Sequence, residues 1–164
     1  MREVVIQNLT RESFAPFGTY YDMKNPSGLS LNGELHRFFP DRLSEAYPER
    51  LGFSSILVKK PAEMLIKQVE HHFTTPELIL PLNDDMIIHV SPATADYPNV
   101  SQTKAFLVPC GTLVKIATAI WHLVPLPVNG DMLSAMIVLP ETVYARDCPV
   151  ISLKEEDYYL LKRE

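Results

Sequence analysis

The chain contains little cysteine, no long apolar run and no signal-peptide pattern. Its two cysteines, Cys110 and Cys148, lack C-x-x-C spacing. Two cysteines cannot build a disulfide framework, so we expect reduced thiols packed as small apolar side chains. No uninterrupted apolar stretch reaches the ~18 residues that span a bilayer, and the first residues lack an apolar block. These absences exclude a disulfide-stapled or membrane-spanning protein and predict a cytoplasmic location.

The chain also lacks a concentration of positive charge. Its net charge is -5, its pI is about 5.5, and no basic cluster is longer than a pair such as Lys59-Lys60. A nucleic-acid backbone needs a basic patch, so we expect no nucleic-acid partner. Hydrophobic residues make up 46% of the 164 residues and charged residues 21%, which is ordinary for a globular protein. This length and composition predict a single domain over residues 1–164.

Helical periodicity is scarce, and short apolar or alternating runs separated by Pro, Asn, Asp and Gly dominate the chain. About ten such runs, with turn residues between them, predict an all-β sandwich or barrel. The runs are VVIQ, TYYDM, LHRFF, FSSILVKK, MLIKQVEHH, ELILPL, MIIHVS, TKAFLVP, TLVKI, IWHLVPLPV and MLSAMIVLP. Two short helices are expected beside them. One covers Thr10 to Phe14, and the other begins at Ser152, where Glu155 completes a capping box.

The stretch QVEHHFTTPELIL, residues 68–80, combines acids and histidines. Residues i and i+2 of a strand share a face, so Glu70 and His72 should point one way and His71 the other. If the Thr-Thr-Pro segment at 74–76 reverses the chain, Glu77 returns beside His72. This stretch therefore predicts one imidazole and two carboxylates on one wall.

The stretch KIATAIWHLVP, residues 115–125, carries the single tryptophan, Trp121, beside His122. Alone, a histidine in an apolar run is more often a core residue bonded to the backbone. In a barrel, an inward His122 would face the same interior as His72. Trp121 is either a core or rim aromatic or a platform for a substrate. We expect His71 and His89 to be outward-facing or structural.

The spacing of these residues resembles that of the cupins, small β-barrels with two sequence motifs. The first motif is G-x5-H-x-H-x3,4-E-x6-G. Here the corresponding positions hold Met64, Glu70, His72, Glu77 and Asp84. Glutamate replaces the first histidine, while the intervals are kept. The resemblance implies a double-stranded β-helix, or jelly-roll, barrel.

The second cupin motif, G-x5-P-x-G-x2-H-x3-N, is also recognisable by its intervals. Its positions hold Gly111, Ala117, Ala119, His122 and Leu126. Both turn residues are alanines, and leucine replaces the asparagine. His122 keeps its distance from Gly111, which favours a site over a core histidine.

Segments along nearly the whole chain resemble the ureidoglycolate lyase family, a cupin-fold group. The resemblance lies in the order and spacing of LTRESFAPFG, NGELHRFF, SSILVKKPAE, Glu70 and His72 with Pro81, Trp121-His122, DMLSAMIVLP and DCPVISL. It implies a homodimeric cytosolic enzyme of purine nitrogen metabolism that cleaves ureidoglycolate to glyoxylate and urea.

That reaction indicates roles for the conspicuous residues. Expelling urea needs a base at the substrate hydroxyl and an acid or Lewis acid near the leaving nitrogen or the forming carbonyl. Buried histidine and glutamate can supply either role, because their pKa values shift toward neutrality. The substrate carboxylate calls for a cation, and Arg37 and Lys115 are the candidates, although Lys115 sits where a strand residue can also point outward.

The expected metal site consists of His72, Glu77 and His122. Glu70 is either a fourth ligand or an acid/base, and the sequence leaves this open. Cupins often hold an ion, and this mixed nitrogen and oxygen set suits Ni, Mn, Fe, Co or Zn without choosing among them.

The chain departs from the lyases around the Trp-His pair. The family usually has a polar, histidine-containing turn before this pair and a second histidine after it. Here residues 116–119 read IATA, Leu123 follows the pair, and Val58 stands where a basic residue is usual. Three alternatives therefore stay open: a non-catalytic cupin that binds or senses a small ligand, a cupin enzyme with another substrate, and a structural, dimer-forming barrel.

Overall fold

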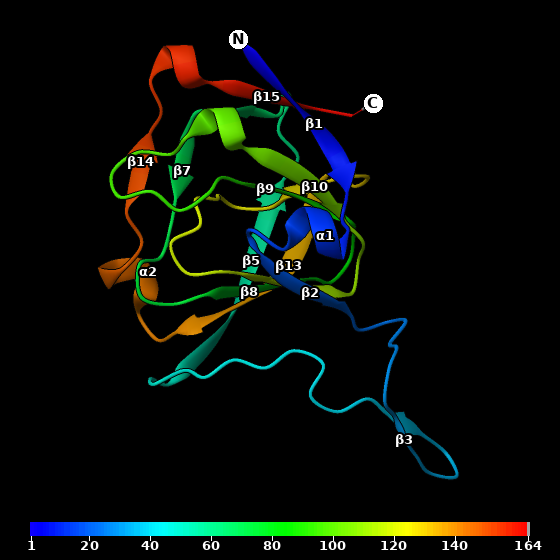
Figure 1. Ribbon diagram of the computed structural model, residues 1–164. Coiled ribbons are helices and arrows are strands. Elements are labelled where there is room, and N and C mark those ends of the chain that lie inside the picture. Colours follow the sequence, from blue (N-terminus) through cyan, green and yellow to red (C-terminus); the bar gives the residue numbers. More distant parts are fainter. Residues whose placement is uncertain (164) are drawn as a thin grey trace.

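Two curved β-sheets pack against each other in the computed structural model, which describes residues 1–163 (Figure 1). The six-stranded sheet has the order β12 (Leu126–Pro127), β9 (Met86–Val90), β10 (Lys104–Val108), β1 (Arg2–Asn8), β15 (Tyr159–Lys162) and β6 (Leu65–Ile66). The five-stranded sheet has the order β2 (Gly18–Asp22), β11 (Thr112–Ile116), β8 (Glu77–Pro81), β13 (Met132–Pro140) and β5 (Leu51–Lys59). Two small sheets pair β14 (Val150–Ser152) with β7 (Gln68–Glu70), and β3 (Leu31–Asn32) with β4 (Arg37–Phe38). The all-β barrel expected from the short alternating runs is confirmed.

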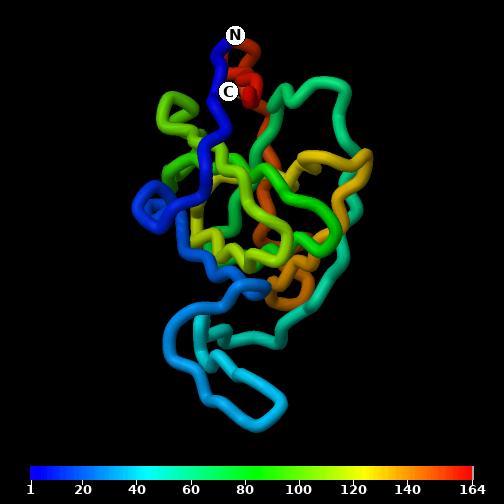
Figure 2. The backbone as a smooth tube through the Cα atoms, turned by 90° about the vertical axis from the view of Figure 1, so that its right-hand side faces the viewer, coloured from blue at the N-terminus to red at the C-terminus, as the bar shows by residue number. Residues whose placement is uncertain are grey.

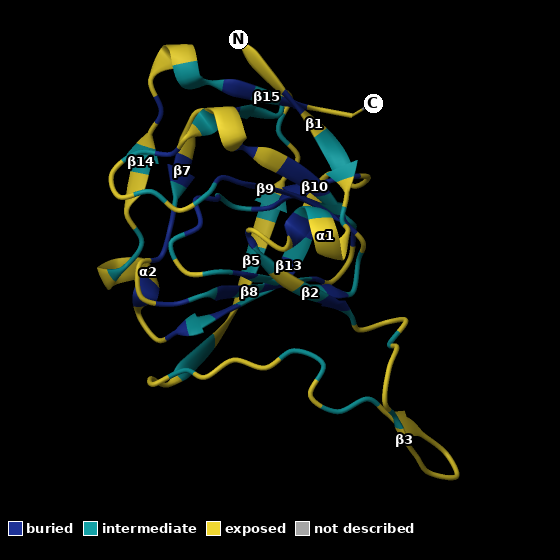
Figure 3. Ribbon diagram, viewed as in Figure 1, coloured by how far each residue is buried: buried dark blue, intermediate teal, exposed yellow. Residues whose placement is uncertain are grey.

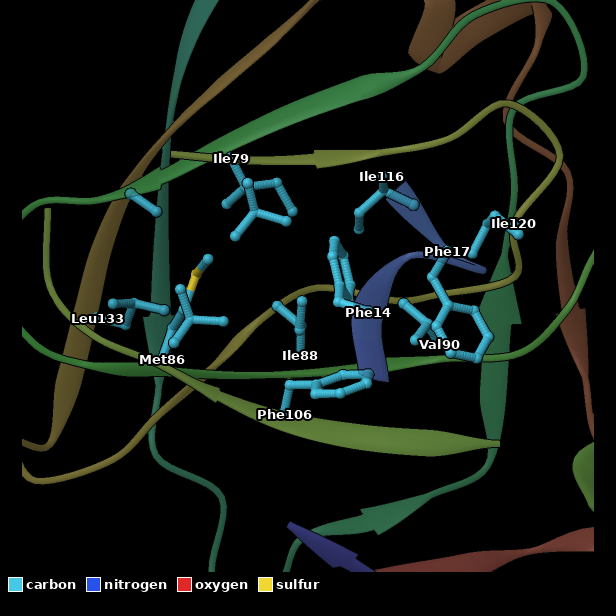
Figure 4. Packing of buried hydrophobic residues seen from close by; sticks show 13 residues of the cluster. Phe14, Phe17, Ile79, Met86, Ile88, Val90, Phe106, Ile116, Ile120 and Leu133 are labelled. Carbon is cyan, nitrogen blue, oxygen red and sulfur yellow. The ribbon is translucent and has the colours of Figure 1, made fainter. Parts of the chain in front are cut away.

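The main core fills the space between the two large sheets (Figure 4). Strands of both sheets contribute to it, with Ile79 from β8 and Ile88 from β9 both almost fully buried. Phe14 and Phe17 enter from the segment before β2, and the Phe14 ring meets Phe106 edge-on at a centroid distance of 5.2 Å. The aromatic segment near the N-terminus therefore closes one side of the barrel.

Strand β9 is buried on both faces because it separates two hydrophobic clusters. Met86, Ile88 and Val90 face the main core, whereas Ile87 belongs to a second cluster beneath β6, β7 and the C-terminal strand. All five residues of β9 are buried, and four of them are apolar, so the strand lacks the alternation of a half-exposed strand. His89 lies on the Ile87 side of the strand and is equally buried.

One of the two expected helices is present and the other is not. Helix α1 (Arg11–Phe14) begins after Thr10, whose hydroxyl accepts a hydrogen bond from the Ser13 backbone at 3.1 Å. The helix expected from Ser152 is wrong, because Ser152 ends strand β14 and pairs with Gln68. The remaining helical segments are α2 (Val143–Arg146) and the 3-10 turns η1 (Val100–Gln102) and η2 (Glu155–Asp157).

Several expected runs are shorter or divided in the structure. MLIKQVEHH contains two strands, β6 and β7, which join different sheets. Within the IWHLVPLPV run, the only named strand is β12. Residues Tyr159–Lys162 form a strand that the sequence patterns did not single out. The C-terminal residues pair in parallel with β1, a long-range contact that local alternation does not reveal.

The segment between β2 and β5 leaves the barrel and forms an arm, residues 24–44, which ends in the β3–β4 hairpin (Figures 1 and 2). Most of the arm is exposed (Figure 3). Several large apolar side chains on it face solvent: Leu29, Leu31, Leu35 and Phe38. The arm therefore extends well beyond the hydrophobic clusters that stabilise the barrel.

The structure also describes the two cysteines and tests for a membrane-spanning helix. Cys110 and Cys148 are unpaired and only partly buried. Among residues 1–163, no helix combines the length and the hydrophobicity needed to cross a membrane.

Candidate functional site

Strands β7 and β8 position one half of the site. Strand β7 ends at Glu70, the chain bends through residues 73–76, and β8 begins with Glu77. This bend leaves Glu77 beside His72, the juxtaposition expected from the sequence. Glu77 is on the inward face of β8, two residues before the core residue Ile79.

The turn after β11 positions the other half. Glu70 and His122 exchange two backbone hydrogen bonds of 2.7 and 2.8 Å, which fix the height of His122 beside β7. The Ala119 N–H donates to the His72 carbonyl at 2.7 Å, and Ala119 has a left-handed φ of 64°. This is the position where the cupin motif has glycine, because glycine adopts a positive φ without steric cost.

The three predicted ligands converge at the end of the barrel. The Nε2 atoms of His72 and His122 lie 2.8 and 3.3 Å from the same carboxylate oxygen of Glu77. Potential ligand atoms of all three residues lie within 4.8 Å of one another. The exposed fractions of His72, Glu77 and His122 are only 3%, 7% and 2%. The site is thus a covered cluster rather than an open surface.

Backbone carbonyls orient both imidazoles. The Nδ1–H of His72 donates to the Asp147 carbonyl at 2.6 Å, and the Nδ1–H of His122 donates to the Ile120 carbonyl at 2.8 Å. A carbonyl can only accept, so each Nδ1 carries the proton and each Nε2 faces Glu77. Metal-binding histidines are commonly held in this way.

The carboxylate dominates the electrostatics of the cluster. Burial alone would lower the pKa of His72 and His122, but hydrogen bonds to Glu77 raise both above the ordinary value. Burial would raise the pKa of Glu77, and the bonds to the two histidines instead lower it to about 2. The contacts with Glu77 therefore favour the charged form of both imidazoles, and the contacts with the imidazoles favour the charged form of Glu77.

The donor set fits a divalent transition metal. Two imidazole nitrogens and one carboxylate oxygen, with both Nδ1–H groups already bonded, match the ligand chemistry of Ni, Mn, Fe, Co and Zn. A metal would compete with protons for the two Nε2 atoms, so its binding should weaken as the pH falls.

Glu70 lies beside this cluster but makes a different contact. Its carboxylate accepts a hydrogen bond from the Cys148 thiol at 3.2 Å. Burial raises the pKa of Cys148 to about 12, with the Glu70 charge as a further cause, so the thiol stays protonated. The geometry therefore leaves Glu70 outside the three-residue group, while its charge still contributes to raising the pKa of His72.

Trp121 packs against His71 rather than opening into the cluster. The two rings stack at a centroid distance of 3.7 Å with 13° between their planes, and the indole N–H donates to Thr94 at 2.7 Å. Trp121 is 1% exposed. A substrate contact with this ring would require a side chain to move. His71 and His89 are both buried, so the outward orientation considered for them is wrong and the structural one holds.

The two candidate cations lie away from His72, Glu77 and His122. Arg37 is in the exposed β3–β4 hairpin, where its guanidinium lies 5.2 Å from the Phe39 ring centroid. Lys115 neighbours the inward residue Ile116 on β11, so it points outward, where it forms an ion pair of 2.7 Å with Glu45. Within residues 1–163, no lysine or arginine forms a hydrogen bond or ion pair with the cluster.

Two residues near the cluster were not singled out as site residues from the sequence. The Asp147 carboxylate accepts hydrogen bonds from the backbone of Phe73 and Thr74, both at 2.9 Å, and so anchors the loop after His72. Tyr47 lies where the Glu77 charge contributes to its raised pKa, after burial and Glu45. Both are far from the histidines in sequence, so no local spacing marks them.

The fold and the cluster together define a cupin-type β-barrel with a site of two histidines and one carboxylate. Residues 1–159 match the sequence model of the family described as Ureidoglycolate lyase, and the chain belongs to the ureidoglycolate lyase family. A ureidoglycolate lyase from Azotobacter vinelandii is 24% identical over 167 residues, covering 99% of each chain. One from Pseudomonas syringae pv. syringae is 29% identical over 128 residues, covering 74% of each chain.

Solved structures are more distant. A Bacillus subtilis oxalate decarboxylase is 14% identical and aligns with a TM-score of 0.45 over 64% of this chain. This chain spans 24% of that protein's length. A likeness this low transfers neither metal nor chemistry.

Proposed function

We propose that this protein cleaves ureidoglycolate, or a closely related small carboxylated ureide, to glyoxylate and urea. The observation that carries the proposal is the convergence of two imidazole Nε2 atoms on the Glu77 carboxylate in a chain of this family. Curated relatives that align along most of the chain have the name ureidoglycolate lyase.

The cluster suits the proton movements of this reaction. The substrate carries a hydroxyl and a ureido nitrogen on one carbon. One proton leaves the hydroxyl as the carbonyl of glyoxylate forms, and one proton reaches the nitrogen as the carbon–nitrogen bond breaks. When no ion is bound, an imidazole and a carboxylate within hydrogen-bond distance of each other can accept the first proton and deliver the second.

A divalent ion held by His72, Glu77 and His122 would supply Lewis-acid chemistry at the substrate oxygen. The ion's identity among Ni, Mn, Fe, Co and Zn stays a prediction. Whatever the ion, the bonds of the Asp147 and Ile120 carbonyls fix the orientation of both imidazoles. Burial of the cluster excludes water and strengthens its electrostatics.

The direct test is turnover by the purified protein. Ureidoglycolate is supplied with each of the five ions in turn, and urea and glyoxylate are measured together. We expect equal amounts of both products, strongly reduced in Glu77→Gln and retained in Glu3→Gln, a remote surface control. The absence of turnover with every ion would reject the activity.

The alternative is a cupin that binds a small ligand without catalysis. Two observations favour it. Among residues 1–163, no lysine or arginine forms an ion pair with the cluster. Ala117, Ile120 and Val58 also present apolar side chains to the main core. Calorimetric binding of glyoxylate or oxalate without any turnover would support this function over the lyase.

We further propose that the protein is a homodimer in which the arm contacts a second copy. The reason is that Leu35 and Phe38 on the arm, and Phe53 and Leu57 on the edge strand β5, are all more than half exposed. Exposed apolar edges commonly mark association surfaces. Light scattering that gives a monomer mass at working concentration would reject the dimer. The cytoplasmic location stays a prediction beside it.

A further inference from the structure

One segment contacts the elements that build the site without supplying any of its three converging residues. The chain returns from the arm through residues 45–49 before it enters β5. We call this segment the strap, and three contacts attach it to the elements that build the site.

The strap is held at both ends by ion pairs. Glu45 pairs with Lys115 on β11, the strand that leads to the His122 turn. Glu49 pairs with Arg146, which directly precedes the residue whose carbonyl orients His72. Side chains of both pairs remain partly exposed. Exposed ion pairs contribute little stability, so these attachments are easily broken.

Tyr47 lies at the centre of the strap and points toward the cluster. Its hydroxyl donates to the carbonyl of Pro76 at 3.5 Å, and Pro76 directly precedes Glu77. Burial raises the pKa of Tyr47 to about 12, with the charges of Glu45 and Glu77 as further causes. The phenol is therefore partly buried against the backbone of the residue that precedes Glu77.

The three residues of the cluster are buried, whereas the strap beside them is weakly attached. His72, Glu77 and His122 are each less than 8% exposed, so a ligand or ion reaches them only if something moves. The strands beneath belong to the main core and are costly to displace. The strap has no place in the large sheets and carries the exposed ion pairs.

We propose that residues 45–49 form a movable strap that controls entry to the His72–Glu77–His122 site, and that Tyr47 is the side chain that fills the entrance. This inference rests on the proposed site but not on the proposed reaction. Small ligands would enter when the strap lifts, and the size of residue 47 would set which ones fit.

Histidine modification tests the strap without requiring any turnover. Diethyl pyrocarbonate reacts with accessible imidazoles, and mass spectrometry reads each histidine separately. Exposed His36 on the arm normalises the reagent, and buried His89 reports on loosening of the barrel. The quantity measured is the rate at His72 and His122 relative to His36, in metal-free protein.

The Glu45→Gln/Glu49→Gln variant and Tyr47→Ala should raise this relative rate about fivefold to tenfold, as expected when weak attachments are lost. Tyr47→Phe keeps the ring and should stay within about twofold of the parent. Glu3→Gln, which breaks the remote pair with Lys162, is the matched control and should change nothing.

The outcomes separate cleanly. Unchanged rates at His72 and His122 in both opening variants would overturn the strap. A parallel rise at His89 would also contradict it, because it would mean a loosened barrel rather than an opened entrance. Failure of the ureidoglycolate assay leaves these rates unaffected, so the reaction and the strap stand or fall independently.

Discussion

Two pairs of buried histidines share the same barrel and differ in one respect. His72 and His122 face the carboxylate of Glu77, whereas His71 and His89 face aromatic rings. All four are at most 3% exposed. The pKa values of His72 and His122 are raised. Burial lowers the pKa of His71. Burial and the charge of His122 lower the pKa of His89 to about 3.

The comparison teaches that burial alone does not make a histidine functional. Burial is the largest influence on each of the four and favours the neutral form every time. Only a carboxylate within hydrogen-bond distance reverses the result. The second pair instead leaves one ring nitrogen each, Nδ1 of His71 and Nε2 of His89, without a partner. His71 therefore packs as an aromatic core side chain, and His89 is held through Nδ1 by the Tyr159 hydroxyl at 2.8 Å.

The largest effect should come from making the same substitution in each pair. His122→Phe leaves the buried Glu77 carboxylate with one partner fewer and should cost about 3–5 kcal/mol of unfolding free energy. His71→Phe keeps an aromatic ring on Trp121 and removes an unpaired nitrogen, so stability should change by about 1 kcal/mol or less. Urea unfolding measures both. Equal losses would contradict the division into two pairs.

The pH dependence of stability should separate the pairs next. His89 has a folded pKa of about 3, below the ordinary 6.5, so the unfolded chain binds more protons between these values. Stability should then fall by about 1.4 kcal/mol per pH unit as the pH drops below 6.5. His89→Gln should remove this part of the acid slope. Denaturant titrations at several pH values give the slope, and an unchanged one would contradict the depressed pKa.

The two histidines that contact Glu77 should change stability with pH in the opposite direction to His89. The raised pKa values of His72 and His122 give stability that is present below pH 6.5 and lost as the pH rises through them. The depressed pKa of Glu77 gives stability that is present above its ordinary value of 4.5 and lost as the pH falls toward about 2. Acid sensitivity between pH 6.5 and 4.5 should therefore belong to His89 and His71, whose pKa values are lowered, rather than to Glu77.

Metal affinity should distinguish the two glutamates near these histidines. Glu77→Gln removes a ligand and should weaken binding of Co or Zn by about 100-fold or more. Glu70→Gln should weaken it by about tenfold at most, because Glu70 bonds to Cys148 instead. Titration calorimetry compares the two variants. Equal losses would show that Glu70 is a fourth ligand, the possibility left open by the sequence.

The sequence predicted the local parts of this site better than its surroundings. The expected bend after His72 accounts for Glu77 lying beside it, and the interval from Gly111 singles out His122, which contacts the same carboxylate. The i, i+2 alternation also put Glu70 on this wall, but Glu70 bonds to Cys148 instead. These relations depend on backbone geometry within one or two strands. The elements that orient and cover the cluster, Asp147 and Tyr47, come from distant segments, and only the tertiary fold brings them close.

The wrong expectations have the same origin. Ser152 has the spacing of a helix cap, but pairing with Gln68 in a strand overrides this local preference. The candidate cations were chosen for their charge, which does not reveal that Arg37 lies on an arm and that Lys115 faces outward to Glu45. Local sequence signals therefore identify the residues that converge in the cluster but not those that surround it.

The smallest expected effect concerns the turn that carries His122. Ala119 adopts a φ of 64°, which strains any residue with a Cβ, whereas Ala117 in the same turn does not have a positive φ. Ala119→Gly should therefore raise the unfolding free energy by about 0.5–1 kcal/mol, and Ala117→Gly should lower it by a similar amount. Thermal and urea unfolding measure both variants. If Ala119→Gly were as destabilising as Ala117→Gly, the left-handed turn would not be the reason that the cupin pattern has glycine at this position.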